Sequence, residues 1–435
     1  MRYDGPVICR NFHNMNGRLI RRCGVRTSRW RFVFFAGMLG WFAPLHAADW
    51  PQLLGPDRNG CVEGTIADIW PAQGPRVVWS KSLGAGWAGP AVAAGKLIAF
   101  YRRGDKDVVE AIDARIGAPI WSFEYPAGYH DDFGFDEGPR AGPTSDGDRI
   151  YTHGAQGLLH CLSLADGKLL WRIDTAQELG STKGFFGRVC APLIVGPMLI
   201  LQIGAVDRGA GIVGLDKMTG TVKWKATRHE AGYSSPIAAT LNNVHYAFCF
   251  TRNGLVGLNP ADGQVYFEMP WRSRQHASVN AATPLVSPDG TVFISASYNT
   301  GAAALKIDGG KPHVLWSGDE ILSNHYATSI YHSGNLYGFD GRQEQGPELR
   351  CVELASGRVK WTTDGLGGGS LIRVGPRLLV LTDKGRLLQI AANPAGYQVI
   401  AQAEVLGAQT RANPAFAQGY WYGRDTQKLI CLDLR

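Results

Sequence analysis

The chain has 435 residues, 45% of them hydrophobic and 19% charged, with 44 Lys and Arg against 37 Asp and Glu. Eight of the arginines and one acid, Asp4, lie in the first 47 residues, so 36 residues of each sign remain from residue 48 onward. The formal charge of +7 therefore belongs to the N-terminal segment. The rest of the chain lacks the basic footprint that binds nucleic acid or anionic lipid.

Residues 1–47 have the composition of a secretory signal peptide. Six arginines between positions 18 and 31 precede an apolar run at 32–45, and small residues at Ala47 and Ala48 offer a cleavage site. The run of about 14 residues is short for a membrane span. We predict cleavage after Ala47 and a periplasmic or secreted protein without stable membrane insertion. No cysteine follows the site, which argues against a lipoprotein, and Met15 is an alternative start.

The segment 48–75 is an N-terminal arm without hydrophobic periodicity. It is rich in turn residues, including the run W-P-Q-L-L-G-P-D-R-N-G at 50–60. Because nothing in it alternates as a strand does, we predict that this arm packs on the outside of the folded domain. The domain itself is predicted to extend over residues 76–435, with no Ser/Gly linker to divide it.

From residue 76 onward the sequence repeats one hairpin. An apolar strand leads into a polar turn that ends in glycine, and an aromatic residue follows four positions later, as in Gly117/Trp121, Gly167/Trp171, Gly220/Trp224, Gly263/Phe267 and Gly357/Trp361. The glycine supplies the positive φ of the turn. The strand before it is apolar on both faces, which predicts burial between two layers. A repeat of roughly 40–50 residues predicts a propeller or solenoid, with the aromatic residue wedged between neighbouring blades.

The repeats predict a closed ring of eight blades. Seven full units begin near Ala88, Ala141, Cys190, Ser234, Ala282, Ala327 and Gly368. Residues 74–79 read as an isolated last strand, and residues 428–435 read as the strand that should precede it. Pairing these two ends would remove both sheet edges. We therefore predict an all-β, eight-bladed propeller of four-stranded antiparallel blades.

These units resemble the PQQ-like repeat, the tryptophan-docked blade of quinoprotein alcohol dehydrogenases and of the outer-membrane assembly propeller. More closely, the chain is similar to exported bacterial PQQ-binding-like β-propeller repeat proteins, in the segments 50–60, 138–144, 231–236, 280–284 and 324–329. The resemblance implies the fold over nearly the whole chain after the leader. Because the same fold serves catalysts and scaffolds, it does not by itself imply one function.

Two function classes follow from the resemblance. The first is an exported non-catalytic propeller that binds a protein partner or a small anionic ligand. The second is a PQQ-dependent oxidoreductase, with PQQ and Ca²⁺ as cofactors. Quinone dehydrogenases of this kind hold their cofactor over adjacent half-cystines with a calcium ion and a catalytic Asp. This chain has no adjacent cysteine pair and none of the standard catalytic motifs, so we favour the first class.

The predicted site lies where the blades open toward the central channel. Six blades begin with small residues and a proline, such as Ala88-Gly89-Pro90, which suits crowding at one mouth. The side chains beside these entries should converge: Trp87, Arg140, Arg188, Tyr233, Asn280, His325, Ser370 and Arg411. Convergent polar groups in a concave mouth predict a binding site, and three arginines favour an anion. The alternative is that the arginines pair with loop acids and brace the ring.

An acidic loop at 129–137 is a second candidate site. Four carboxylates and a neighbouring histidine offer oxygen and nitrogen ligands for Ca²⁺: Asp131, Asp132, Asp136, Glu137 and His130. Their spacing is not that of a regular calcium loop. The alternative is that they are solvated, or that they pair with Arg140 and Arg188. Six cysteines follow the leader; Cys161, Cys351 and Cys431 hold equivalent blade positions and are expected in the core, and a disulfide among the other three is left open.

Overall fold

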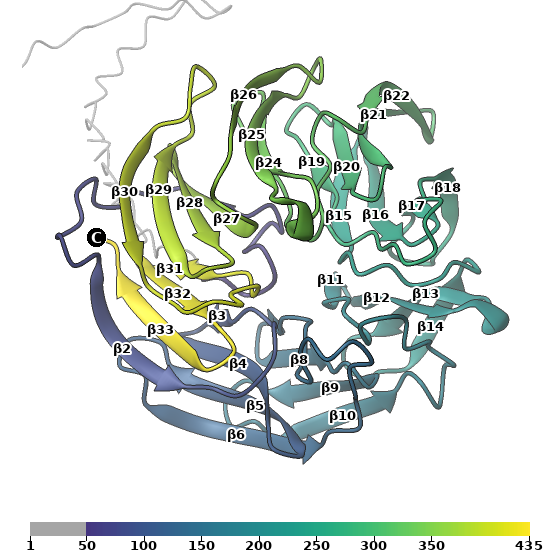
Figure 1. Ribbon diagram of the computed structural model, residues 1–435. Helices are drawn as coiled ribbons and strands as arrows, with labels where there is room; N and C mark the ends of the chain where they lie inside the picture. The colour runs from purple at the N-terminus through teal and green to yellow at the C-terminus, as the bar shows by residue number, and fades with distance from the viewer. Residues whose placement is uncertain (1–48) are drawn as a thin grey trace, which may run out of the picture. The chain divides into compact units, whose positions relative to one another are not determined.

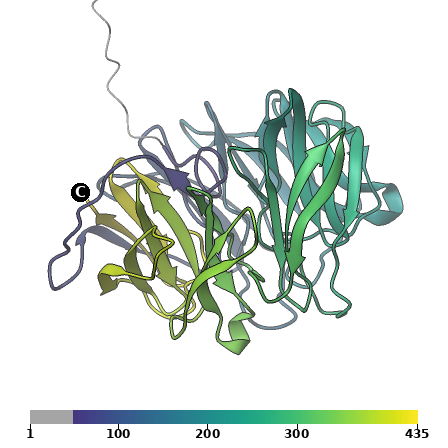
Figure 2. The same cartoon turned by 90° about the horizontal axis from the view of Figure 1, so that it is seen from above.

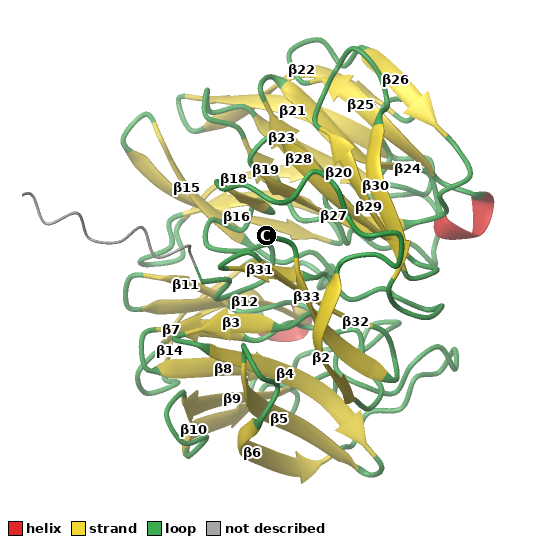
Figure 3. Ribbon diagram, turned by 90° about the vertical axis from the view of Figure 1, so that its left-hand side faces the viewer, coloured by secondary structure: helices red, strands yellow, loops and turns green. Residues whose placement is uncertain are grey.

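The computed structural model describes residues 49–435. In this part of the chain, eight β-sheets are arranged around a common centre (Figure 1). Strands and loops make up nearly all of the described chain, and helix is confined to two single turns, η1 (Val206–Arg208) and η2 (Gln343–Gln345) (Figure 3). No helix in residues 49–435 has the length and apolarity needed to cross a membrane. The predicted signal peptide lies outside the described residues.

Seven blades are each formed by four consecutive antiparallel strands. Blade 1 comprises β3 (Ala91–Ala93), β4 (Lys96–Arg103), β5 (Lys106–Asp113) and β6 (Pro119–Pro126). Blade 2 comprises β7 (Thr144–Asp146), β8 (Arg149–His153), β9 (Leu158–Ser163) and β10 (Leu169–Asp174). Blade 3 comprises β11 (Leu193–Val195), β12 (Met198–Ala205), β13 (Ala210–Asp216) and β14 (Val222–Ala226). Blade 4 comprises β15 (Ile237–Leu241), β16 (Val244–Thr251), β17 (Gly254–Leu258) and β18 (Val265–Pro270).

The next three blades follow the same order. Blade 5 comprises β19 (Leu285–Val286), β20 (Val292–Ala296), β21 (Gly301–Asp308) and β22 (Lys311–Gly318). Blade 6 comprises β23 (Ile330–His332), β24 (Asn335–Asp340), β25 (Glu348–Glu353) and β26 (Val359–Thr363). Blade 7 comprises β27 (Gly369–Val374), β28 (Arg377–Thr382), β29 (Arg386–Ala391) and β30 (Val399–Glu404). The first strand of each blade lies toward the ring centre, and the fourth lies toward the rim (Figure 1).

The eighth blade is built from both ends of the described chain. Its strands β31 (Ala415–Ala417), β32 (Tyr420–Arg424) and β33 (Lys428–Asp433) are completed by β2 (Arg76–Ser82). β2 pairs antiparallel with β33, with Val77 opposite Leu432 and Trp79 opposite Cys431. The ring therefore closes without an open edge at this blade. The predicted all-β, eight-bladed propeller is confirmed.

Tryptophans dock six of the eight blades onto the next, as the repeat predicts. The Trp171 ring of blade 2 covers the turn of blade 3, where a Cβ on Gly220 would lie 2.8 Å from the ring. Its Nε1–H donates to the Lys217 carbonyl over 3.0 Å. The same bond recurs from Trp79 to Ala114, Trp121 to Leu164, Trp224 to Pro260, Trp316 to Leu354 and Trp361 to Asn393. A buried ring and a satisfied indole N–H together fix each blade-to-blade angle.

The prediction that the arm packs on the outside of the ring is wrong for residues 50–62, which fill the ring axis. The rest of the arm lies against blades 7 and 8, where the Ala67 N–H donates to the Leu434 carbonyl. Trp50 pairs with Val92 of β3, and β1 (Cys61–Val62) pairs parallel with β27, so the arm crosses the centre from blade 1 to blade 7 (Figures 1 and 2). Between these points Leu54 and Arg58 are almost completely buried. The physical reason is that short inner strands with small residues leave an axial space, which apolar and hydrogen-bonded groups of the arm fill.

The core consists of the apolar faces between adjacent blades. Cys161, Cys351 and Cys431 are fully buried in it, as expected from their equivalent positions. Cys61, Cys190 and Cys249 are also free thiols, so the disulfide left open by the sequence is not formed. Packing thus depends on aliphatic and aromatic contacts rather than on covalent links.

Candidate functional site

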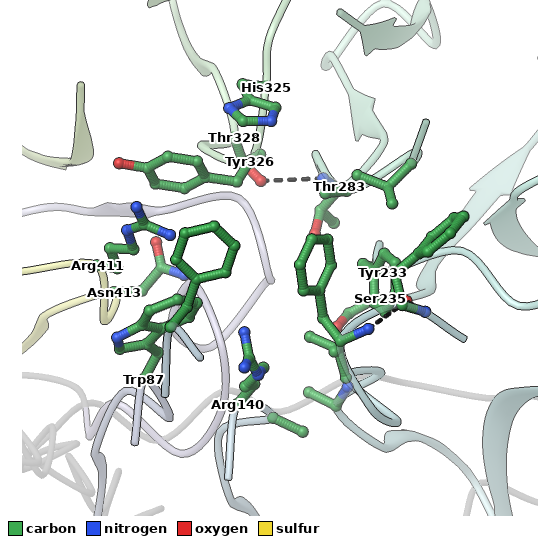
Figure 4. Close-up of a pocket in the computed structure, with 18 of the residues that line it drawn as sticks. Trp87, Arg140, Tyr233, Ser235, Thr283, His325, Tyr326, Thr328, Arg411 and Asn413 are labelled. Carbon is green, nitrogen blue, oxygen red and sulfur yellow. Dashed lines mark hydrogen bonds between the residues drawn. The ribbon is translucent and has the colours of Figure 1, made fainter. Parts of the chain in front are cut away.

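A pocket of about 370 Å³ lies at the ring centre. Five of the eight predicted side chains line it, namely Trp87, Arg140, Tyr233, His325 and Arg411. Figure 4 shows Trp87 and Arg411 on one side of the pocket and Tyr233 on the other. Leu53 of the arm also lines it, together with small residues at the entries to the inner strands. The arm therefore forms part of the pocket and closes the axis behind it.

The predicted crowding of small residues at the blade entries is present. A Cβ on Gly89 would lie 2.3 Å from the backbone oxygen of Asn413, which belongs to the entry of blade 8. A Cβ on Gly142 would lie 3.2 Å from the Gly89 oxygen. The backbones of neighbouring blades thus approach too closely for larger residues, and this close approach brings the flanking side chains together.

Two of the three predicted arginines lie against the Trp87 ring. The Arg140 guanidinium lies 4.4 Å and the Arg411 guanidinium 4.5 Å from the Trp87 ring centroid. Arg140 is paired with Asp131 at 3.0 Å and donates to the Asp136 carbonyl. Arg411 makes no hydrogen bond or ion pair with any of residues 49–435. Arg411 is therefore the uncompensated cation of the pocket.

Arg188, the third predicted arginine, does not line the pocket. Its Nε donates to Ser181 Oγ at 2.7 Å, and its two terminal nitrogens donate to the carbonyls of Gln156 and Ser181. Burial lowers the pKa of Arg188 from its ordinary value. The donors of Arg188 are directed into the neighbouring loops. Arg188 therefore braces the ring, which was the alternative to ligand binding for all three arginines, although its partners are carbonyl and hydroxyl oxygens and not loop acids.

Asn280 and Ser370 also lie outside the pocket lining. The Asn280 side-chain amide donates to the carbonyls of Thr251 and Trp271, each at 2.8 Å, and the backbone carbonyl of Asn280 accepts from the Tyr233 N–H. Ser370 is buried within β27, opposite Leu381. Asn280 thus holds the loop that positions Tyr233, and Ser370 belongs to the sheet.

The acidic loop acts as a clamp for Arg140 rather than as a metal site. Asp131 accepts three backbone N–H bonds from Phe133, Phe135 and Asp136. Burial opposes ionisation of Asp131, but these bonds and Arg140 outweigh it, so its pKa is lowered.

The other candidate metal ligands have separate partners. Asp132 pairs with Lys183, Asp136 accepts from the N–H groups of Gly86 and Gly138, and Glu137 pairs with Arg102 and His130. Within residues 49–435, no three acidic, His or Cys side chains gather in a metal-binding arrangement. The partner predicted for Arg140 is present in this loop, while Arg188 has no partner there.

His325 is neutral and orients Tyr298. The Gln343 N–H donates to His325 Nδ1 at 3.3 Å, so the proton of the neutral ring resides on Nε2, 2.9 Å from Tyr298 Oη. Burial lowers the pKa of His325 to about 4, and burial raises that of Tyr298. Because Tyr298 Oη accepts from His325, its own O–H is left to donate to another group.

Several buried donors around the pocket have no partner within residues 49–435. They are Trp87 Nε1, Arg140 Nε and Tyr326 Oη. Figure 4 shows the Tyr326 hydroxyl on the same side as Arg411. These residues line the pocket, but the three donor atoms themselves are covered by protein, so they are unsatisfied donors within the pocket wall.

The sequence reasoning missed an aromatic rim on two facing loops. Phe133 and Phe135 are about half exposed, at 52% and 50%, and Phe186 packs against Phe133 with ring centroids 5.2 Å apart. Tyr233 Oη accepts the backbone N–H groups of both Phe185 and Phe186. The signal in the sequence was the pairing of phenylalanines, F-G-F and F-F, within polar loops. Tyr298, Tyr326, Arg342 and Glu344 also line the pocket and were not predicted.

Comparison with known proteins places this geometry in a family. A family profile described as outer membrane protein assembly factor BamB matches residues 105–363. The chain belongs to this family of PQQ-like propeller repeats. Outer membrane protein assembly factor BamB of Burkholderia pseudomallei (strain K96243) is 26% identical over 179 residues, which is 39% of this chain and 40% of that protein. The chain thus matches less than half the length of this relative.

Solved structures share the fold at low identity. The crystal structure of BamB from Moraxella catarrhalis is similar with a TM-score of 0.61 and 18% identity, over 83% of this chain and 98% of that chain. Quinohemoprotein alcohol dehydrogenase from Comamonas testosteroni is similar with a TM-score of 0.66 and 15% identity, over 89% of this chain and 80% of that chain. At these identities the likeness shows the propeller fold alone.

The donor set of the pocket does not fit the Ca²⁺ ion that the family resemblance implies alongside PQQ. Calcium takes about six to eight oxygen ligands, largely carboxylates and carbonyls. Glu344 is the single carboxylate in the described lining, and it pairs with Arg342 at 3.4 Å. The rest of the lining is dominated by donors and aromatic rings, which suit an anionic ligand with a planar body.

Proposed function

We propose that this protein is an exported, non-catalytic binding propeller that holds a small carboxylate ligand with an aromatic body at the mouth of the ring. The observation that carries the proposal is the Arg411 guanidinium, which lies over Trp87 in an aromatic-walled pocket and has no partner among residues 49–435. A guanidinium with free donors binds a carboxylate through two parallel hydrogen bonds. Export rests on the predicted signal peptide, and the ligand class rests on the pocket.

The charge balance of the lining supports a monoanion. Asp131 compensates Arg140, and Glu344 compensates Arg342. His325 is neutral because its pKa is lowered to about 4 by burial. Arg411 is then left with one positive charge that no acid among residues 49–435 balances. A ligand with one carboxylate would neutralise it, whereas a neutral ligand would leave it unpaired.

The walls support a planar, apolar body for the ligand. Arg411 also lies 5.7 Å from the Phe135 ring, and the Phe186 and Tyr233 rings are 5.7 Å apart. Aromatic pairs of this kind accept a further ring by offset or edge contacts. A pocket of about 370 Å³ is at the small end of the range for organic ligands, so the ligand is a compact molecule.

The titratable groups support binding rather than proton transfer. A general acid or base works best with a pKa near the working pH. Burial lowers the pKa of His325 to about 4, and burial raises that of Tyr298 and Tyr326 above the usual range. The pKa values of these pocket groups are thus shifted away from neutral pH. A scaffold that presents or retains a ligand is the function we infer, over the PQQ-dependent oxidoreductase.

Calorimetry with 1-naphthoate and its neutral isostere 1-naphthamide tests the proposal. We expect the naphthoate to bind more tightly, and Arg411→Gln to weaken it by about 1.5–3 kcal/mol, the scale of a hydrogen bond to a charged group. Arg188→Gln is the matched control, since it removes an arginine that braces a loop; it should lower the melting temperature and leave affinity unchanged. Equal affinity of the two isosteres would contradict the proposal, as would dye-linked alcohol oxidation on adding PQQ and Ca²⁺.

A further inference from the structure

The arm contributes one arginine that is buried on the ring axis. Arg58 is 3% exposed, although it belongs to a turn-rich segment. Its Nε donates to Gln52 Oε1 at 2.8 Å and its Nη1 to the Pro236 carbonyl at 2.7 Å. Its Nη2 donates to the Pro192 carbonyl and, at 3.4 Å, to Thr144 Oγ1. One side chain thus bonds to blades 2, 3 and 4 at their inner strands.

The charge of Arg58 has no acidic partner. No Asp or Glu in residues 49–435 forms an ion pair with it, and all of its observed hydrogen bonds end on neutral oxygens. Burial lowers the pKa of Arg58 to about 10, which still leaves the guanidinium charged at neutral pH. An uncompensated buried cation is costly, and carbonyl dipoles offset only part of that cost. The remaining positive potential acts on whatever lies nearby.

The binding pocket lies close to the Arg58 guanidinium. Pro192 and Pro236, which accept from Arg58, directly follow the pocket-lining residues Ala191 and Ser235. Leu53, from the same arm, lines the pocket itself. The guanidinium therefore lies just behind the wall of the pocket, in a region of low polarity where a charge is weakly screened.

We propose that Arg58 determines the charge selectivity of the pocket, favouring an anionic ligand through the wall without touching it. This inference rests on the proposed function, because it concerns the same ligand. It assigns the arm a second role: the arm closes the axis, and it also brings a positive charge behind the site. Arg411 binds the carboxylate directly, whereas Arg58 is a positioning charge whose donors are already occupied.

The test measures the ratio of the dissociation constants for 1-naphthamide and 1-naphthoate in the full chain. Two unit charges roughly 10 Å apart at an effective dielectric constant of about 20 interact strongly enough to change an equilibrium about tenfold or slightly more. We expect Arg58→Gln to reduce the ratio by about that factor, and Arg58→Lys to retain it. Arg76→Gln is the matched control, because it removes an exposed arginine of the outer strand β2.

A second pair of variants keeps the test decisive if Arg58→Gln does not fold. Cys190 is buried, and the nearby Arg58 charge offsets part of the rise that burial gives to the pKa of its thiol. Cys190→Asp places a carboxylate beside Arg58 and cancels its charge in place, while Cys190→Asn is the neutral control. The ratio should fall in the Asp variant alone. A folded Arg58→Gln or Cys190→Asp variant with the wild-type ratio would overturn the role of Arg58. A wild-type protein without any preference for the naphthoate would instead overturn the proposed function.

Discussion

Replacing Gly220 by alanine should destabilise the propeller by two separable effects. Gly220 has a φ of +76°, a conformation that L residues adopt at a cost. A Cβ there would also lie 2.8 Å from the Trp171 ring of the preceding blade. Gly95 is the matched control, because it has a φ of +74° and a methyl group added there would have no other atom within 4 Å.

The expected magnitudes follow from these two geometries. The left-handed conformation costs a residue with a Cβ roughly 1–2 kcal/mol, so Gly95→Ala should lose about that much free energy of unfolding. Overpacking against a well-packed group adds about 1–3 kcal/mol, so Gly220→Ala should lose more than Gly95→Ala by this second amount. The difference between the two variants isolates the blade-docking contact.

Urea unfolding of both variants, alone and combined with Trp171→Phe, checks the reasoning. The atoms nearest to the added methyl belong to the six-membered ring of the indole, which phenylalanine removes from that position. The penalty of Gly220→Ala should therefore shrink in the Trp171→Phe background, and the penalty of Gly95→Ala should not. If the two alanine variants are equally stable, or if no coupling to Trp171 appears, tryptophan docking does not control this interface.

Two further predictions concern the closure of the ring and the loss of stability at low pH. Deleting residues 428–435 removes β33, leaves β2 without a partner and exposes one edge of β32, which then pairs with β31 alone. We therefore expect aggregation on size-exclusion chromatography; a soluble truncation with a cooperative melt would contradict closure at this blade. Burial lowers the pKa of His153, His160 and His325 to about 4 each. Because their unfolded pKa is near 6.5, the stability they contribute is complete above about pH 6.5 and is lost as the pH falls toward 4, by up to about 3 kcal/mol per histidine. The melting temperature should drop across that range, and His153→Gln should make the drop smaller; a flat profile would refute the assignment.

The fold was predictable because its signal is local. Glycine at the turn and tryptophan four residues later, as in Gly167 and Trp171, both act within one hairpin and its neighbour. Closure was predictable because two half-units remained at the ends of the chain. The place of the arm was not predictable in this way. Its burial depends on the width of the ring axis, which no periodicity in residues 50–60 encodes, although an arginine between turn residues was a signal that Arg58 has a specific partner.

The candidate site was predictable as far as blade geometry determines it. Residues just before the inner strands, such as Trp87 and Arg411, do reach the pocket. Arg188 starts from an equivalent place, but its loop directs it onto backbone carbonyls instead. Tyr298 and Arg342 were missed because they follow the second strands of blades 5 and 6 and do not belong to the blade entries. Side-chain direction in loops depends on turn geometry, which spacing alone does not reveal.

The arm changes what an eight-bladed ring can do. An open axis would let water reach the pocket from both faces, and water would screen Arg411 and satisfy the free donors on Trp87 and Tyr326. Leu53 lines the pocket and occupies space near the axis that water would otherwise fill. Hydrogen bonds and charges are stronger in such surroundings, and unpaired donors cost more. The same arm that stabilises the ring therefore raises the free-energy gain from a ligand that brings acceptors, and this links the course of residues 50–60 to binding in the pocket.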